Sequence, residues 1–212
     1  MKPHTGRLVF LSIGWIFALA NPARADFASS PELAKPLAIG AVAPAFTARQ
    51  ADGKPFAFVP SRLDRPQVLI FYRGGWCPFC NAQLADMHEV EPQLRAAGFQ
   101  VLFVSTDRSQ LLYSSLKDQK VPYTLLSDPR LLAAQAFHVA YRLNDSQYAE
   151  QLKYGVDLEK TTGTKDHALP VPSVFIIDRT GVIRFVYSNP DFRVRLSAQD
   201  LWQAAVPLAN KH

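Results

Sequence analysis

Two cysteines, the only ones in this chain of 212 residues, stand three positions apart at Cys77 and Cys80. They directly follow an apolar run, 68–72, and a short turn with two glycines, 73–76. Pro78 suits the first position of a helix, because the N–H that proline lacks would have no partner there. We therefore predict a buried strand that ends in a turn, with Cys77 capping the helix that follows and both thiols on its first turn.

The start of a helix favours redox chemistry at such a pair of thiols. Unpaired N–H groups and the positive end of the helix dipole favour the thiolate, which is the reactive form of cysteine. The pKa of a free cysteine is ~8.5, and such settings lower it to roughly 3.5 to 7.5. We expect Cys77 to be the more exposed thiolate, since a capping side chain faces outward and a third helical position usually turns inward.

A pair of cysteines at this spacing can also form half of a zinc or copper site. A metal site would need further ligands, and the chain has no second cysteine pair. His88, His138 or His167 would have to approach the thiols from distant parts of the sequence. A redox centre is therefore the preferred interpretation, and we predict no metal and no organic cofactor.

Residues 1–25 have the pattern of a secretory signal. Lys2 and Arg7 precede the apolar segment 8–20, and an A-x-A cleavage site follows at 23–25. The apolar segment is shorter than the roughly 20 residues that a membrane span needs. We predict cleavage after Ala25, export to the periplasm or the medium, and a mature chain without a membrane span. An oxidising compartment would keep the thiol pair as a disulfide unless a reductant reaches it.

Loss of the signal changes the charge balance. Lys2, Arg7 and Arg24 leave with it, so Lys+Arg falls from 23 to 20 against 18 acidic residues. No cluster of basic residues interleaved with aromatic ones remains, and a nucleic-acid partner is therefore not expected. The mature length fits a flexible lead, 26–39, and one domain, 40–212.

The order of elements predicts an α/β fold. We expect an N-terminal hairpin (40–47 with 55–59), a central strand (67–72), a helix (77–97) that Pro92 kinks or splits, a parallel strand (100–105), a helix ending at Gln119, a strand (123–126), a helix (129–137), a late hairpin (174–177 with 182–187) and a final helix capped by Ser197. The stretch 141–167 has weak periodicity, with a helix expected over 146–153 and a loop over 161–166. It would form a lid or a substrate wall.

This order, together with several motifs, resembles the thioredoxin-like fold and, within it, the peroxiredoxin-like branch of the alkyl hydroperoxide reductase and thiol-specific antioxidant (AhpC/TSA) family. The motifs are Pro-Ala-Phe-Thr at 44–47, Phe-Tyr-Arg-Gly-Gly-Trp-Cys-Pro-Phe-Cys at 71–80, Val-Ser-Thr-Asp at 104–107, Leu-Ser-Asp-Pro at 126–129 and Phe-Ile-Ile-Asp-Arg-Thr-Gly at 175–181. The resemblance implies a central mixed sheet flanked by helices, with an N-terminal hairpin extension.

The resemblance also implies a function. A peroxiredoxin-like protein would reduce hydroperoxides through a Cys77/Cys80 dithiol-disulfide cycle, reset by a thioredoxin-like or other thiol reductant. The alternative is a thioredoxin-like oxidoreductase that acts on protein disulfides. Aligned with peroxiredoxins, Cys80 falls on the attacking cysteine and Cys77 replaces a threonine; aligned with thioredoxins, Cys77 attacks and Cys80 resolves.

The chain departs from the peroxiredoxin pattern at one further point. Where the family has an arginine that binds peroxide, this sequence has Val171-Pro172-Ser173, which resembles the cis-proline loop of thioredoxins. Arg73 is a candidate substitute that would stabilise a thiolate or an oxyanion; as a plain turn residue it would be solvated. Trp76 would shield the disulfide or pack in the core, and Pro78 lies between the cysteines.

Overall fold

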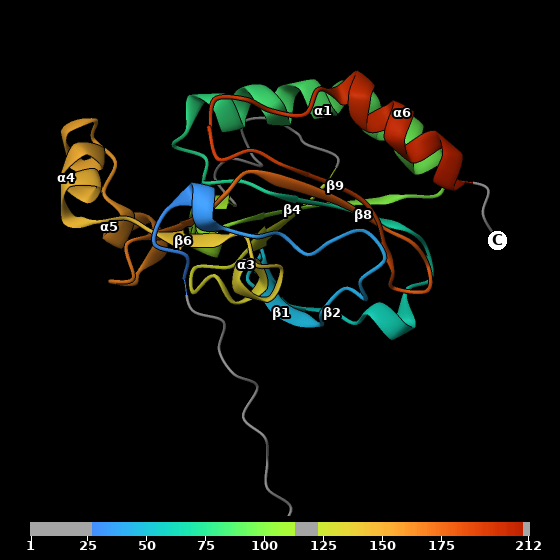
Figure 1. The fold of residues 1–212 in the computed structure, drawn as a ribbon, viewed down its shortest axis with the longest axis horizontal. Coiled ribbons are helices and arrows are strands. Elements are labelled where there is room, and N and C mark those ends of the chain that lie inside the picture. Colours follow the sequence, from blue (N-terminus) through green and yellow to red (C-terminus); the bar gives the residue numbers. More distant parts are fainter. Residues whose placement is uncertain (1–26, 113–122, 210–212) are drawn as a thin grey trace, which may run out of the picture.

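The computed structural model describes residues 27–112 and 123–209, and its centre is a seven-stranded sheet (Figure 1). The order across the sheet is β2 (Pro55–Phe58), β1 (Phe46–Gln50), β5 (Thr124–Ser127), β4 (Gln100–Ser105), β3 (Gln67–Phe71), β8 (Ser173–Ile177) and β9 (Ile183–Ser188). The pairs β3–β4 and β4–β5 are parallel, and the other neighbours are antiparallel. The predicted mixed sheet with an N-terminal hairpin is confirmed.

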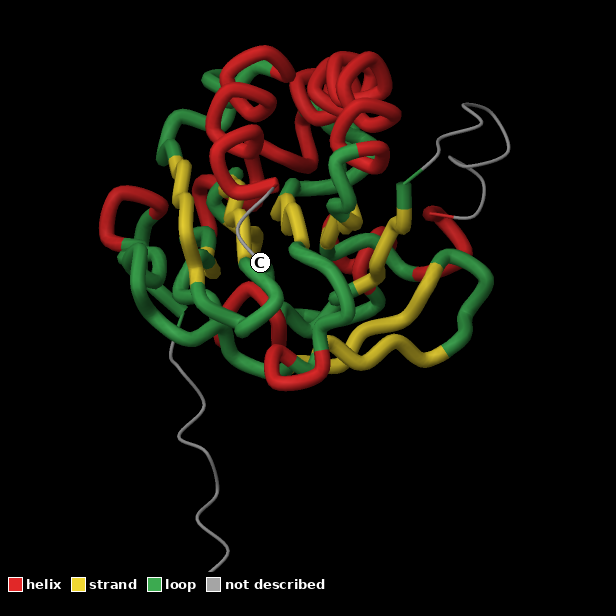
Figure 2. Tube along the Cα trace, turned by 90° about the vertical axis from the view of Figure 1, so that its right-hand side faces the viewer, coloured by secondary structure: helices red, strands yellow, loops and turns green. Residues whose placement is uncertain are grey.

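Helices cover both faces of this sheet. Helices α1 (Pro78–Ala96) and α6 (Ala198–Ala209) lie side by side on one face, and α3 (Leu132–Ala136) lies on the other (Figures 1 and 2). The helices and strands of the chain therefore form three layers, as the resemblance implied.

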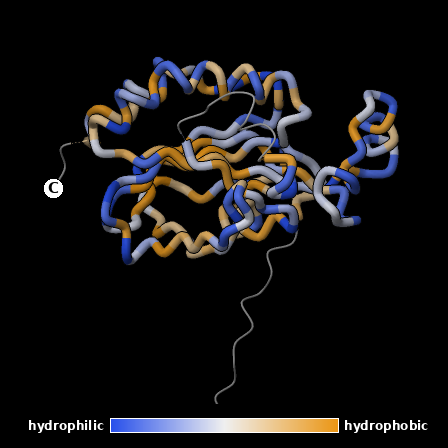
Figure 3. Tube along the Cα trace, turned by 180° about the vertical axis from the view of Figure 1, so that it is seen from behind, coloured by the Kyte–Doolittle hydropathy of each residue, from blue (hydrophilic) through white to orange (hydrophobic). Residues whose placement is uncertain are grey.

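The buried strand β3 supplies side chains to two separate cores. Val68 and Ile70 pack toward α1 and α6, whereas Leu69 and Phe71 point to the opposite core, which contains Phe137. Because side chains alternate along a strand, burial on both faces requires an uninterrupted apolar run. Figure 3 shows this directly, with hydrophobic colour along the central strands and mixed colour along the helices.

Helix α1 follows the predicted boundaries closely. Cys77 is its N-cap residue and Pro78 its first residue. The helix continues past Pro92 to Ala96, so of the two predicted alternatives, a kink or a split, the split is wrong. One interior proline removes a single backbone hydrogen bond, and burial of Leu84, Met87 and Leu94 on the core side keeps the helix together.

A small second sheet carries the stretch that was hardest to interpret. Strands β6 (Ala140–Arg142) and β7 (Ala168–Pro170) pair antiparallel, and α4 (Asp145–Lys153) and α5 (Leu158–Thr162) project from them at one side of the body (Figure 1). Asn144 and Gln147 form a capping box at the start of α4. The helix expected over 146–153 is confirmed, while α5 was not predicted.

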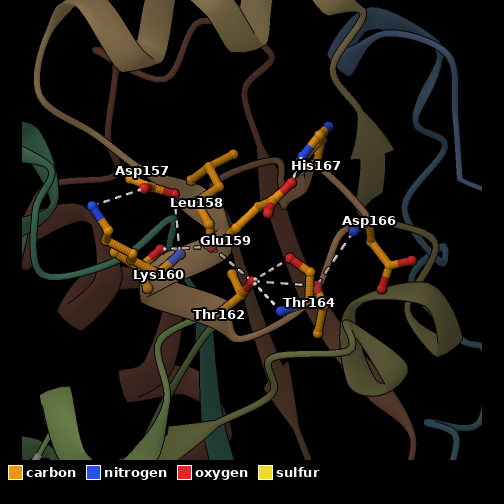
Figure 4. A network of polar contacts seen from close by, with 9 residues as sticks. Asp157, Leu158, Glu159, Lys160, Thr162, Thr164, Asp166 and His167 are labelled. Carbon is orange, nitrogen blue, oxygen red and sulfur yellow. Dashed lines mark hydrogen bonds and ion pairs between the residues drawn. The ribbon is translucent and has the colours of Figure 1, made fainter.

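Polar contacts connect α5 to the turn that precedes β7 (Figure 4). The Thr162 hydroxyl donates to the carbonyl of Leu158 (2.8 Å) and accepts from the backbone N–H of Thr164 (3.0 Å). His167 Nε2 lies 2.8 Å from Glu159 Oε1. The segment expected as a loop therefore begins as the last turn of a helix and continues as a hydrogen-bonded turn.

The lead before the domain also touches the second sheet. The N–H of Ala28 donates to the carbonyl of Ala140 (3.1 Å), and the N–H of Arg142 donates to Ala28 (2.8 Å). A short 3-10 helix, η1 (Pro31–Leu33), follows, and a second one, η2 (Pro60–Arg62), precedes β3. The lead was expected to be flexible, but its described part is hydrogen-bonded to the body.

Two predictions fall largely on residues that the structure does not describe. The signal sequence, 1–25, lies outside the described residues, and so does most of the helix predicted to end at Gln119, of which 109–112 are described and helical. In the described ranges, every helix is too short or too polar to cross a membrane.

Gly74, in the turn after β3, offers a test of this packing. A Cβ atom there would collide with Trp76 Nε1 and lie 2.8 Å from Asp107 Oδ1, so we expect Gly74→Ala to lower the free energy of unfolding by about 1–3 kcal/mol. Gly155→Ala is the control, because its Cβ meets open space and adds only the strain of a positive φ. Urea unfolding of both variants checks this, and equal losses would contradict the close approach.

Candidate active site

The two cysteines lie where the carboxyl end of β3 meets the start of α1. The turn 73–76 joins these elements, and strand pairing places the beginning of β8 at Ser173 beside the end of β3 at Phe71. The parallel neighbour β4 ends at the same edge with Ser105, followed by Thr106 and Asp107. Two β-strand ends and one helix start therefore surround the thiols.

Side chains from β4 and α1 fix the turn that precedes Cys77. The Thr106 hydroxyl donates to the carbonyl of Arg73 (2.9 Å), and Asp107 Oδ2 accepts from the N–H of Gly75 (2.6 Å). Asn81 Nδ2, on the first turns of α1, donates back to the carbonyl of Gly75 (2.9 Å). These contacts set the backbone from which the Cys77 side chain projects.

Both thiols are buried: the exposed fractions are 1% for Cys77 and 0% for Cys80. Cys77 is the more exposed thiol, as expected, but only by this small difference, because both side chains are almost fully removed from solvent. The segment 189–197, which we call the strap, runs from the end of β9 to the start of α6 and passes over the pair. Its Phe192 packs edge-on against Phe79 of α1, with ring centroids 5.7 Å apart.

Arg195 of the strap contacts the sulfur atoms. Its Nη2 lies 3.3 Å from Cys80 Sγ and 4.0 Å from Cys77 Sγ. Its Nη1 donates to Gln83 Oε1 (3.1 Å) and its Nε to the carbonyl of Phe192 (2.8 Å). Sequence reasoning missed this residue, since it stands 115 positions from Cys80 in a segment without a motif.

The two thiols have opposite electrostatic settings. A hydrogen bond from the Cys80 thiol is the largest influence that lowers the pKa of Cys77, and the guanidiniums of Arg73 and Arg195 add to it, giving a pKa of about 6. Burial, followed by the neighbouring Cys77 thiolate, raises the pKa of Cys80 far above its usual value. The geometry therefore separates a thiolate, Cys77, from a thiol that donates to it, Cys80.

Arg73 is buried rather than solvated, so its interpretation as a plain turn residue is wrong. Its exposed fraction is 3%, and its guanidinium carbon lies 4.1 Å from the ring centroid of Phe192 and 4.9 Å from that of Trp76. Its Nη2 donates to Gln151 Oε1 of α4 (3.2 Å). Trp76 itself is half-buried. It packs against the core that contains the two cysteines and also against the small apolar cluster around Tyr141 and Leu169.

Pro172 does not have the geometry expected from thioredoxins. The described ranges contain no cis peptide bond, so the bond between Val171 and Pro172 is trans and that expectation is wrong. Pro172 is buried just before β8, where its carbonyl accepts from the N–H of Asn189 at the start of the strap (3.2 Å). Its observed contact is therefore to the strap.

Asp107 is a second residue whose place at the site was not predicted. Its side chain is buried, and Oδ1 has no hydrogen-bond partner in the described part of the chain. Burial is the main cause that raises its pKa to about 6, and the nearby Cys80 adds to the effect. The motif at 104–107 marked the residue, but only the fold brings its carboxylate close enough to Cys80 for the two groups to influence each other.

The histidines do not converge on the cysteines. His88 is exposed on α1, His138 is exposed after α3, and His167 stacks on Tyr148 beside Glu159. Within residues 27–112 and 123–209, no three His, Cys, Asp or Glu side chains are grouped so as to bind a metal ion. The metal interpretation therefore finds no ligand set here.

Comparison with known proteins gives a family match over most of the chain. The sequence profile of the AhpC/TSA family matches residues 39–186. Chloroplastic peroxiredoxin Q of Suaeda salsa is 28% identical over 153 residues, which is 71% of this chain and 59% of that protein. The same protein of Triticum aestivum is 26% identical over 173 residues, 82% of this chain and 69% of that protein. The chain thus spans about three fifths to two thirds of the length of these relatives.

Solved structures agree on the fold. Peroxidoxin BcpB of Mycobacterium tuberculosis superposes with a TM-score of 0.62 at 19% identity, covering 82% of this chain and 97% of that one. PrxQ of Xylella fastidiosa also gives 0.62, at 17% identity, covering 84% and 99%. The thioredoxin-like architecture of peroxiredoxins is therefore confirmed for this chain.

The contact between Arg195 and the sulfurs predicts an effect on thiolate formation. Replacing Arg195 with Met removes a positive charge beside a buried thiolate, so we expect the pH midpoint of thiolate absorbance at 240 nm to rise from about 6. Arg193→Met is the matched control, because that guanidinium pairs with Asp191 at 2.9 Å. Equal midpoints in wild type and Arg195→Met would show that Arg195 does not stabilise the thiolate.

Proposed function

Because the chain belongs to the AhpC/TSA family, we propose that it is an exported thiol-dependent peroxidase that reduces hydroperoxides through Cys77 and Cys80. The main observation behind this proposal is that the pKa values of the two neighbouring thiols shift in opposite directions: that of Cys77 is lowered and that of Cys80 is raised. The relatives named peroxiredoxin Q support the reaction class. The signal-like pattern of residues 1–25 supports export.

The first step uses Cys77 as the nucleophile. Its thiolate attacks the terminal oxygen of the hydroperoxide, the O–O bond breaks, and the leaving alkoxide or hydroxide takes up a proton. Cys77 becomes a sulfenic acid. Arg195 and Arg73 lie close enough to stabilise both the starting thiolate and the negative charge that develops on oxygen.

The second step uses Cys80 as the resolving thiol. Its sulfur attacks the sulfur of the Cys77 sulfenic acid, the S–O bond breaks, and hydroxide leaves with the Cys80 proton as water. The raised pKa of Cys80 keeps it a thiol until then, so it does not compete for peroxide. The product is a Cys77–Cys80 disulfide, which two electrons from an external thiol reductant convert back to the dithiol.

Trans geometry at Pro172 weakens the case for a protein-disulfide oxidoreductase. That alternative used the resemblance of Val171-Pro172 to a cis-proline loop, and the described residues have no cis bond. The remaining support for it, a C-x-x-C pair after Trp76, is shared by the peroxidase proposal. The peroxidase is therefore the function that we carry forward.

Single-cysteine variants test the proposal. Cys80→Ser is expected to consume one equivalent of hydrogen peroxide in stopped flow and to leave a sulfenic acid at Cys77 that dimedone traps, since serine still donates a hydrogen bond to the thiolate. Cys77→Ser is expected to react no faster than a free thiol, because Cys80 is buried and protonated.

Wild type without the reductant serves as the control, since it should end as an intramolecular disulfide. A fast Cys77→Ser variant with a slow Cys80→Ser variant would reverse the assigned order. Wild type that reacts with hydrogen peroxide and an alkyl hydroperoxide no faster than a free thiol would remove the peroxidase proposal altogether.

A further inference from the structure

An open cleft of about 520 Å³ adjoins the thiol site. It lies between the strap, helix α4 and the short helix η1, which come from three separate parts of the chain. Its lining combines charged, amide and aromatic groups: Pro31, Glu32, Arg73, Tyr141, Leu143, Gln147, Glu150, Gln151, Asn189, Pro190, Asp191, Phe192 and Arg193. Residues between 141 and 151, from the stretch expected to form a lid or a substrate wall, line one side of this cleft.

A buried cation lies at its floor. Arg73 is 3% exposed, and its Nε has no hydrogen-bond partner in the residues that the structure describes. No carboxylate pairs with it in those residues, and Gln151 is its one side-chain hydrogen-bond partner. A buried guanidinium with an open donor favours a carboxylate as ligand.

Anionic side chains lie at the rim. Glu32 and Glu150 are exposed and form no ion pair within the described ranges, whereas Asp191 and Arg193 neutralise one another at 2.9 Å. The amides of Gln147, Gln151 and Asn189 also line the cleft. A ligand with an ammonium at the rim, a carboxylate at the floor and amide groups between them would match this distribution.

The floor of the cleft is close to the reactive sulfur. Arg73 contributes to the lowered pKa of Cys77. Burial is the main cause that raises the pKa of the Tyr141 hydroxyl; Arg73 acts to lower that pKa and Cys77 acts to raise it. The Arg73 guanidinium lines the cleft and stacks on Phe192 and on Trp76, the residue next to Cys77. A carboxylate that draws this guanidinium into the cleft would open the path to Cys77.

We propose that this cleft binds the reductant, a small peptide-like thiol that carries both an ammonium and a carboxylate group. The inference rests on the proposed peroxidase function, since it names the thiol that resets the same dithiol. It follows from the buried Arg73 at the floor, whose Nε has no hydrogen-bond partner in the described residues, from Glu32 and Glu150 at the rim, which form no ion pair there, and from the amide side chains between them.

The reaction balances with two molecules of this thiol. The thiolate of the first attacks Cys77 Sγ, the Cys77–Cys80 bond breaks, and Cys80 leaves as a thiolate stabilised by Arg195 before it takes up a proton. The thiolate of the second attacks the ligand sulfur of the mixed disulfide and releases Cys77 as a thiolate. Two ligand thiols are oxidised to one disulfide, and the protein gains two electrons.

The test measures reduction alone. Protein is oxidised to the disulfide with diamide. Its reduction is then followed with glutathione, which carries the proposed ammonium and carboxylate together with a second carboxylate, and with the neutral 2-mercaptoethanol. We expect the rate of reduction of wild type to saturate as the glutathione concentration rises. For the double variant Glu32→Gln, Glu150→Gln, we expect the half-saturation concentration to be roughly three- to tenfold higher, because exposed charge pairs are lost. Its rate with 2-mercaptoethanol should match that of wild type.

Glu89→Gln is the matched control, because Glu89 is exposed on α1 and does not line the cleft. The inference would be overturned if the reduction rate stayed linear in glutathione concentration. It would also be overturned if the double variant changed the rates with glutathione and with 2-mercaptoethanol equally. The result is independent of the peroxidase proposal: failure of hydrogen peroxide to oxidise the protein would remove that function, while the diamide-oxidised protein still reports on the cleft.

Discussion

A buried negative charge is the constraint on which the rest of this structure depends. Taking a thiolate out of water raises its free energy, so burial alone would keep Cys77 protonated and unreactive. Here a thiol and two guanidiniums surround the sulfur and reverse that effect. The thiolate form of Cys77 is therefore favoured by contacts in the folded state, although the exposed fraction of this residue is only 1%.

Those contacts require distant segments to be fixed in place. Arg73 comes from the turn that β4 and α1 hold through Thr106, Asp107 and Asn81. Arg195 comes from the strap, which is tied at one end by the bond from Asn189 to Pro172 and at the other by the N–H of Ala198, which donates to Asp86 Oδ2 of α1 (2.7 Å). A change in either anchor would move a charge relative to the sulfurs.

The sequence was informative wherever the determining contacts are local. The apolar run of β3, the cap at Cys77 and the late hairpin are set by neighbouring residues, and their positions were predicted within a residue or two. Arg195 was missed because only tertiary packing brings it to the thiols. The near-complete burial of Cys77 was not predicted for the same reason: a helix cap faces outward unless another segment, here the strap, covers it. Helix α5 was missed because five residues contain too little periodicity to mark a helix.

The central claim is that the two thiols titrate separately, with Cys77 as the thiolate. Protein labelled with ¹³C at the cysteine Cβ atoms, assigned through the Cys77→Ser and Cys80→Ser variants, would show each sulfur by NMR as the pH rises under reducing conditions. The account predicts that the Cys77 signal moves with a midpoint near pH 6 and that the Cys80 signal stays at its thiol position well above pH 9. A common midpoint near the ordinary value of ~8.5, or a first transition at Cys80, would contradict it.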